Sequence, residues 1–122
     1  MSESPFWYNT AMAEPSEYAT VKVDDIDIAY TTWGEVGKPG IVLIHGSNAH
    51  MEWWRFTAPF LADNFRIAAL DLSGNGNSGW RERYSGEAFA REVWAVCEAA
   101  KLGPKPIVVG HSFGGFAALE AA

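Results

Sequence analysis

The fold of this chain is decided by residues 107–116, which read IVVGHSFGGF. Three β-branched apolar residues lead directly into Gly-x-Ser-x-Gly, and a small-residue helical pattern follows. A strand that turns sharply into a helix lifts the Ser112 hydroxyl clear of the sheet and places it at the positive end of the helix. Gly110 and Gly114 fit this turn because a side chain at either position would collide where strand and helix meet. The pattern therefore predicts a serine nucleophile; a chance GxSxG in a loop is the alternative.

Composition and charge restrict the class of protein. The 122 residues are 48% hydrophobic and 14% aromatic, which is typical of a globular domain. Nine basic and fifteen acidic residues give a formal net charge of −6, which disfavours nucleic acid and anionic membranes as partners. The single cysteine, Cys97, excludes an internal disulfide, and we expect a buried, inert thiol and a cytoplasmic protein. The first residues contain no basic segment or long apolar run, so we expect no signal peptide and no membrane span.

Hydrophobic periodicity divides the chain into a tail and one domain. Residues 1–18 show no period and are expected to form an N-terminal tail, whereas residues 19–122 form a partial domain. Alternation predicts a hairpin, apolar runs predict strands, and a period of 3.6 predicts helices. The first half is expected to form a hairpin over 19–34 that turns at Asp24-Asp25, a strand at 41–44 and an amphipathic segment at 51–63 that Pro59 bends or breaks. A strand at 65–70 and a Gly-rich loop at 72–79 should follow. The last part is expected to form a helix from a Ser85 cap to Gly103-Pro104, a strand at 107–109 and a helix after Ser112.

Strands that alternate with helices predict an α/β fold. Such a chain forms a parallel sheet covered on both faces, with right-handed crossovers. Active sites in these sheets lie beyond the carboxyl ends of the strands. His45-Gly46, Asp71 and Ser112 each follow a predicted strand. We therefore expect all the unusual chemistry of this sequence at one edge of the sheet.

A serine at this position needs help from other groups. Its hydroxyl is a weak nucleophile, so a base must take the proton during attack. Donors must also stabilise the oxyanion that forms on the attacked carbonyl, and each is typically worth about 3 kcal/mol of barrier. The backbone N–H of Phe113, at the start of the helix, is one candidate donor. The backbone N–H of Ser47, after His45-Gly46, is the second.

The base is not assigned from the sequence. His111 adjoins Ser112, and neighbouring side chains should point in different directions at this turn. His45 ends a strand and is better interpreted as a structural histidine that holds its loop. His50 is expected to be an exposed loop residue. Asp71 begins the Gly-rich turn and is expected to fix that turn rather than to orient a histidine.

Three motifs together resemble the first landmarks of the α/β-hydrolase superfamily. They are His45-Gly46, the segment DLSGNGNS at 71–78, and GHSFGG at 110–115, in the usual order and at the usual separations. The resemblance covers roughly residues 19–122. It implies Ser112 as nucleophile and the Ser47 and Phe113 N–H groups as oxyanion hole. The residues that carry the motifs are His45, Gly46, Asp71, Gly74, Gly76, Gly110 and Gly114.

The resemblance also implies a reaction class. The serine is similar to that of esterases, lactonases and carbon–carbon bond hydrolases, and differs from the aspartate of dehalogenases and epoxide hydrolases. We expect hydrolysis of an ester or related acyl bond in a small molecule through an acyl-enzyme, with no metal or other cofactor. Substrate identity, a cap domain and the choice among esterase, lactonase, carbon–carbon hydrolase and acyltransferase stay open.

The chain is short for this family. The family order is nucleophile, acid, histidine, and the sequence ends ten residues after Ser112. We therefore expect the N-terminal half of an α/β-hydrolase fold, without triad acid or histidine, and inactive alone. The resemblance places the strand Ile107–Val109 beside the strand at 41–44 and leaves its other edge open, which favours self-association. The alternative is a non-catalytic half-domain that binds a partner or a second copy through that edge.

Overall fold

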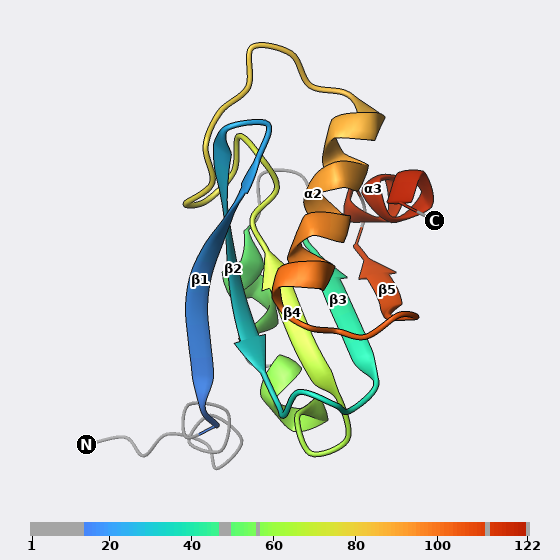
Figure 1. Cartoon of the computed structure of the whole chain (residues 1–122). Helices are drawn as coiled ribbons and strands as arrows, with labels where there is room; N and C mark the ends of the chain where they lie inside the picture. Colours follow the sequence, from blue (N-terminus) through green and yellow to red (C-terminus); the bar gives the residue numbers. More distant parts are fainter. Residues whose placement is uncertain (1–13, 47–49, 56, 112, 122) are drawn as a thin grey trace, which may run out of the picture.

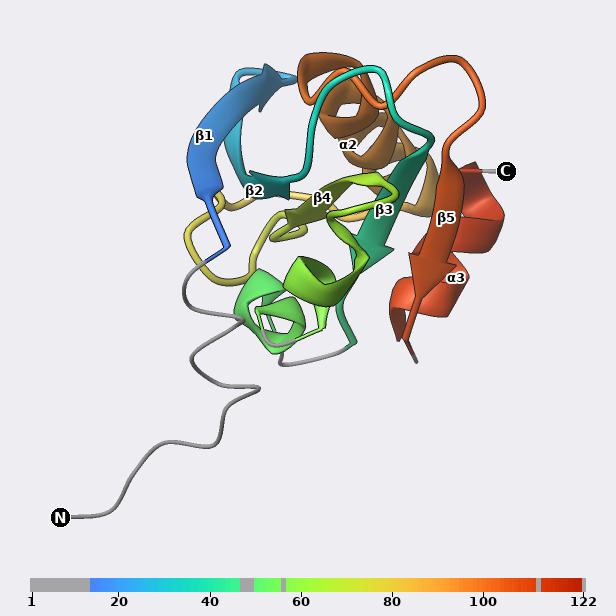
Figure 2. The same cartoon turned by 90° about the horizontal axis from the view of Figure 1, so that it is seen from below.

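The computed structural model describes residues 14–46, 50–55, 57–111 and 113–121, and a five-stranded mixed sheet forms its centre (Figure 1). The strand order is β1-β2-β4-β3-β5. Two α-helices cover one face, and two short 3₁₀ helices cover the other (Figure 2). The elements are β1 (Ser16–Val23), β2 (Ile26–Trp33), β3 (Gly40–Ile44), η1 (Met51–Trp54), η2 (Ala58–Leu61), β4 (Arg66–Leu70), α2 (Gly86–Ala99), β5 (Ile107–Gly110) and α3 (Phe113–Ala121).

The strand pairing confirms the predicted hairpin followed by parallel strands. β1 and β2 are antiparallel, β2 pairs antiparallel with β4, and β3 pairs in parallel with both β4 and β5. Ile44 of β3 is level with Leu70 of β4 and with Gly110 of β5. The carboxyl ends of the three parallel strands therefore meet at one edge of the sheet.

The hairpin turns where the sequence predicts, but its first strand is longer. Asp24 and Asp25 have φ values of 53° and 65°, the left-handed pair that a two-residue hairpin turn requires. β1 begins at Ser16, which pairs with Trp33, so the expected tail over residues 1–18 overlaps the strand by three residues. The start of β1 is exposed on both faces and shows no hydrophobic alternation, which is why periodicity missed it.

The amphipathic segment after β3 is broken just before Pro59. It forms two 3₁₀ turns, η1 and η2, and Pro59 lies in the first turn of η2. A proline in a first turn permits a helix to start there but opposes its continuation from the preceding residues, so the break between η1 and η2 agrees with the expectation that Pro59 bends or breaks the segment. Buried residues of the segment, Met51 and Ala58 among them, pack on the sheet face that carries Trp33.

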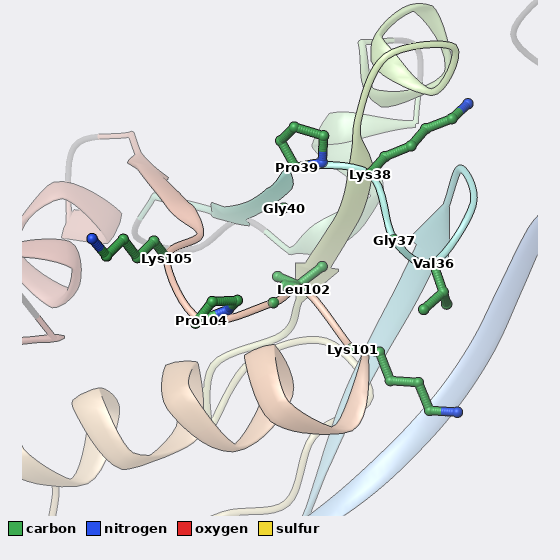
Figure 3. A pocket seen from close by; sticks show the side chains of 10 residues that line it. Val36, Gly37, Lys38, Pro39, Gly40, Lys101, Leu102, Pro104 and Lys105 are labelled. Carbon is green, nitrogen blue, oxygen red and sulfur yellow. The ribbon is translucent and has the colours of Figure 1, made fainter.

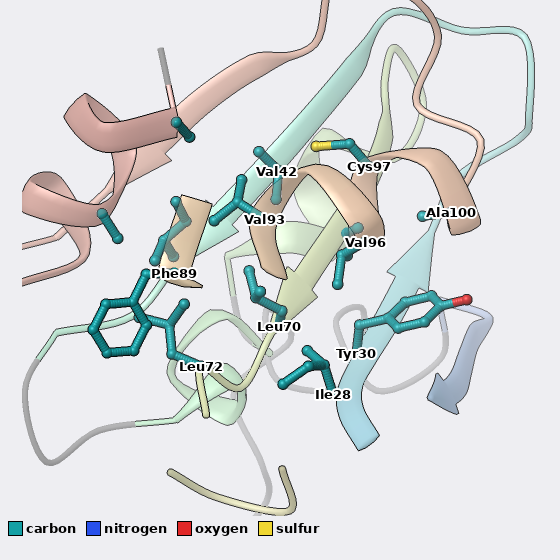
Figure 4. Packing of buried hydrophobic residues seen from close by; sticks show 14 of the residues in the cluster. Ile28, Tyr30, Val42, Leu70, Leu72, Phe89, Val93, Val96, Cys97 and Ala100 are labelled. Carbon is teal, nitrogen blue, oxygen red and sulfur yellow. The ribbon is translucent and has the colours of Figure 1, made fainter. Parts of the chain in front are cut away.

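The larger core lies between α2 and the opposite face of the sheet (Figure 4). Ser85 caps α2 as expected: its hydroxyl accepts a hydrogen bond from the Ala88 N–H at 3.1 Å. Val93, Val96 and Cys97 point from α2 into this core. Burial raises the pKa of the Cys97 thiol to about 12, so the thiol is inert, as the sequence predicts. Among the described residues, no helix combines the length and the apolar character needed to cross a membrane.

Candidate active site

The carboxyl edge of the parallel strands gathers the sequence-predicted motifs. His45-Gly46 follows β3, Asp71 follows β4, and His111 follows β5. The β5 loop is tied to β3 directly, because the His111 N–H donates to the Ile44 carbonyl at 3.0 Å. Ser112 and Ser47, the predicted nucleophile and one predicted oxyanion donor, lie outside the described residues.

The β5–α3 connection packs backbone against backbone. A Cβ at Gly110 would overlap the carbonyl of Gly114, and a Cβ at Gly114 would overlap the carbonyls of Ile44 and His45. The Gly114 N–H donates to the His111 carbonyl at 2.9 Å. The first turn of α3, which begins at Phe113, therefore lies against the carboxyl end of β3. Only glycine permits this approach, which brings the start of α3, where Phe113 is the predicted donor, against Ile44 and His45 at the end of β3.

His45 is buried, and both its ring nitrogens are engaged. The Leu72 N–H lies 3.0 Å from Nε2, so Nε2 must accept, and Nδ1 then carries the proton and donates to the Gly46 carbonyl at 2.7 Å. Burial lowers the pKa of His45 below its ordinary value and favours this neutral ring. A ring with both nitrogens bonded to backbone holds its loop and offers no free base.

Asp71 is buried and binds backbone N–H groups on both oxygens. Its Oδ1 accepts from Met51 N–H at 2.7 Å, and its Oδ2 accepts from Asn77 N–H at 2.9 Å. The Asp71 carbonyl accepts from the Ser78 hydroxyl at 2.5 Å. Gly76, with φ 49°, passes so close that a Cβ there would overlap the Asp71 carboxylate. Asp71 thus fixes the Gly-rich loop, in which Gly74 also takes a left-handed φ of 81°.

Sequence reasoning missed a buried carboxylate beside this loop. Glu92 of α2 is fully buried, and it accepts from the Ser73 N–H at 2.7 Å and from the Ser73 hydroxyl at 2.6 Å. Arg81 Nε donates to the same carboxylate at 2.8 Å, and Arg81 Nη1 reaches Asp24 at 2.9 Å. The helical spacing could have predicted this buried carboxylate. Glu92 follows Phe89 by three residues, so a helix places it on the apolar face, where a carboxylate needs hydrogen-bond partners.

A hollow of about 660 Å³ lies away from these residues (Figure 3). Residues 36–40, which lead into β3, and residues 101–105, which lead toward β5, line it. It therefore opens at the amino ends of the parallel strands, and the motif residues lie at their carboxyl ends. Among the described residues, no group of three His, Cys, Asp or Glu side chains could hold a metal ion.

Comparison with known proteins places this geometry in a family. Residues 39–122 match the model of the alpha/beta hydrolase fold. The pimeloyl-[acyl-carrier protein] methyl ester esterase of Methylococcus capsulatus is 42% identical over 85 residues, which are 69% of this chain and 31% of that protein. Lipase LipV of Mycobacterium tuberculosis is 35% identical over 97 residues, 80% of this chain and 36% of the lipase.

A solved structure gives the same result for the fold. Epoxide hydrolase A from Mycobacterium thermoresistibile superimposes with a TM-score of 0.80 at 23% identity, over 88% of this chain and 34% of that enzyme. This chain thus spans about a third of the length of the relatives it matches. Because the family model matches residues 39–122, which are more than half of the chain, the chain belongs to the alpha/beta hydrolase fold family.

Proposed function

We propose that this chain carries the nucleophile and the oxyanion-binding part of a serine hydrolase that acts on esters or related acyl bonds of small molecules. The observation that supports it is the close approach at Gly114, where the first turn of α3 lies against the Ile44 and His45 carbonyls. This contact joins the two loops from which an oxyanion hole would be built. Relatives named as an esterase and a lipase agree with this chemistry.

In the proposed reaction, the Ser112 oxygen attacks the substrate carbonyl carbon while a base removes its proton. The N–H groups of Phe113 and Ser47 donate to the resulting oxyanion, each contributing about 3 kcal/mol to transition-state stabilisation. The alcohol then leaves with the proton, and water releases the acyl group from the serine. His45 and Asp71 hold loops through bonds to backbone, so neither serves as base or acid here.

The triad acid and histidine are therefore proposed to come from outside these 122 residues, and the chain alone is proposed to be inactive or nearly so. An oxyanion hole without its base leaves a small residual rate at most.

A fluorophosphonate probe tests the nucleophile. We expect covalent labelling at Ser112 in the protein as its gene encodes it, and about 10³-fold slower labelling of the 122-residue chain, because general-base activation is lost. Ser112→Ala should abolish the labelling, and Ser16→Ala, at the exposed start of β1, should not change it. Mass spectrometry of the labelled peptide identifies the site. Labelling that survives Ser112→Ala, or none in the gene-encoded protein, would contradict the proposal.

A second candidate function is association through the edge of β5. Among the described residues β5 pairs only with β3, and its Ile107 and Val109 side chains are 51% and 39% exposed. Leu119 of the neighbouring helix α3 is 77% exposed. Unpaired backbone groups flanked by apolar side chains form a template for another strand. We propose that a second copy of the chain, or the remainder of a longer hydrolase, covers this edge.

Sedimentation over a range of concentrations tests the edge. We expect the 122-residue chain to self-associate and Val109→Lys to shift it toward monomer, since a lysine on an edge strand opposes pairing. Tyr18→Lys, at an exposed position of the opposite edge strand β1, is the control and should leave the association unchanged. A monodisperse wild-type monomer, or equal association of both variants, would count against the β5 edge.

A further inference from the structure

A continuous series of hydrogen bonds joins Glu92 on α2 to the loop that follows β3. The Glu92 carboxylate binds the N–H and the hydroxyl of Ser73 at 2.7 and 2.6 Å. The next residue back, Leu72, donates its N–H to His45 Nε2 at 3.0 Å. His45 Nδ1 then donates to the Gly46 carbonyl at 2.7 Å. Three short links therefore connect a helix on one face of the sheet to the edge that carries the candidate site.

The first link, between Glu92 and Ser73, is fixed by burial and by a charged partner. Glu92 is fully buried, and its carboxylate accepts a charge-assisted bond from Arg81 Nε at 2.8 Å. The Arg81 side chain is itself only 7% exposed, and its Nη1 binds Asp24 at 2.9 Å in the β1–β2 turn. Arg91 Nη2 also binds the Asp24 carboxylate, at 2.8 Å. A carboxylate fixed by packing and by a charged partner has little freedom to move, so it can define the position of Ser73.

The middle link transmits that position because the residues are adjacent. Ser73 follows Leu72 directly, and only the φ and ψ angles of Leu72, which is fully buried, separate the two N–H groups, so a shift of Ser73 also shifts the Leu72 N–H. That N–H fixes the His45 tautomer: while it donates to Nε2, the ring proton stays on Nδ1. Loss of the Leu72 bond would free the ring to exchange tautomers and to turn.

The last link reaches the proposed oxyanion hole. The series of bonds ends at the Gly46 carbonyl, and a planar peptide unit joins this carbonyl to the N–H of the next residue, Ser47, which is the proposed oxyanion donor and lies outside the described residues. We infer that Glu92 is a positioning residue of the candidate site, acting through Ser73, Leu72 and His45 on the Gly46 peptide. Its catalytic meaning rests on the proposed function, but the linkage itself does not.

Glu92→Gln tests the linkage with little change in volume. The amide can still accept from the Ser73 N–H, but its NH₂ group cannot accept from the Ser73 hydroxyl or from Arg81 Nε. We expect amide exchange at Leu72 to accelerate about tenfold, the equivalent of one lost hydrogen bond, and the nitrogen shifts of His45 to show mixed tautomers. Ser73→Ala, which keeps the backbone bond, should give a smaller change in the same direction. Glu98→Gln, at an exposed position of α2, is the matched control and should change neither signal.

These measurements separate positioning from packing. A lower melting temperature of Glu92→Gln with unchanged Leu72 exchange and unchanged His45 tautomer would overturn the inference. In the gene-encoded protein we further expect Glu92→Gln to slow fluorophosphonate labelling while leaving the folded fraction unchanged. Altered His45 signals with no labelling of the wild-type protein would remove the proposed function and leave the linkage in place.

Discussion

Gly114→Ala is expected to lower the free energy of unfolding by about 3 kcal/mol, at the upper end of overpacking effects. The added Cβ would overlap the carbonyl oxygens of Ile44 and His45. These are backbone atoms at the end of a central strand, so no side-chain rotation can make room. The first turn of α3 would have to move away from β3, which also separates the two loops of the candidate site. Urea denaturation followed by tryptophan fluorescence measures the change.

Gly115→Ala is the matched control for this prediction. A Cβ at Gly115 would meet the Gly110 carbonyl at 3.8 Å, an ordinary van der Waals distance. Alanine is favoured over glycine inside a helix by up to about 1 kcal/mol. This variant should therefore be neutral or slightly stabilising. Equal destabilisation by both variants would show that α3 tolerates no added methyl group and that the approach to β3 is not the cause.

Arg81→Met is expected to cost about 3–5 kcal/mol, the range for breaking one side of a buried ion pair. Methionine fills much of the same volume but leaves the Glu92 carboxylate buried without its 2.8 Å partner. Desolvation of that charge is then uncompensated. Arg91→Met is the comparison and should change the stability much less, because Arg91 pairs with Asp24 at the exposed surface, where solvent screens the attraction.

A double variant distinguishes charge from packing at this site. With Glu92→Gln added to Arg81→Met, the buried group is neutral and no longer needs a cation, so the double variant should be more stable than Arg81→Met alone. Denaturant midpoints of the four proteins in this cycle provide the coupling energy. Strictly additive effects would mean that the two side chains do not interact energetically, despite their geometry.

Much of the fold was predictable because its signals are local. The left-handed turn at Asp24-Asp25, the Ser85 cap and the approach of Gly110 to Gly114 each depend on residues within a few positions. The error at the start of β1 has the same origin. This part of the strand is an exposed edge with no hydrophobic alternation, so it gives no local signal.

The sequence by itself determined the order of strands and helices and the gathering of His45, Asp71 and the serine motif at strand ends, since periodicity and glycine spacing act over short distances. Only the tertiary structure decided which charged side chains become partners around the loop that follows β4. Arg81 reaches Glu92 across 11 residues and Asp24 across 57. No local pattern specifies such partners. These contacts form because a carboxylate buried on a packed helix is stable only when a positive charge and hydrogen-bond donors lie beside it, and the tertiary fold decides which residues supply them.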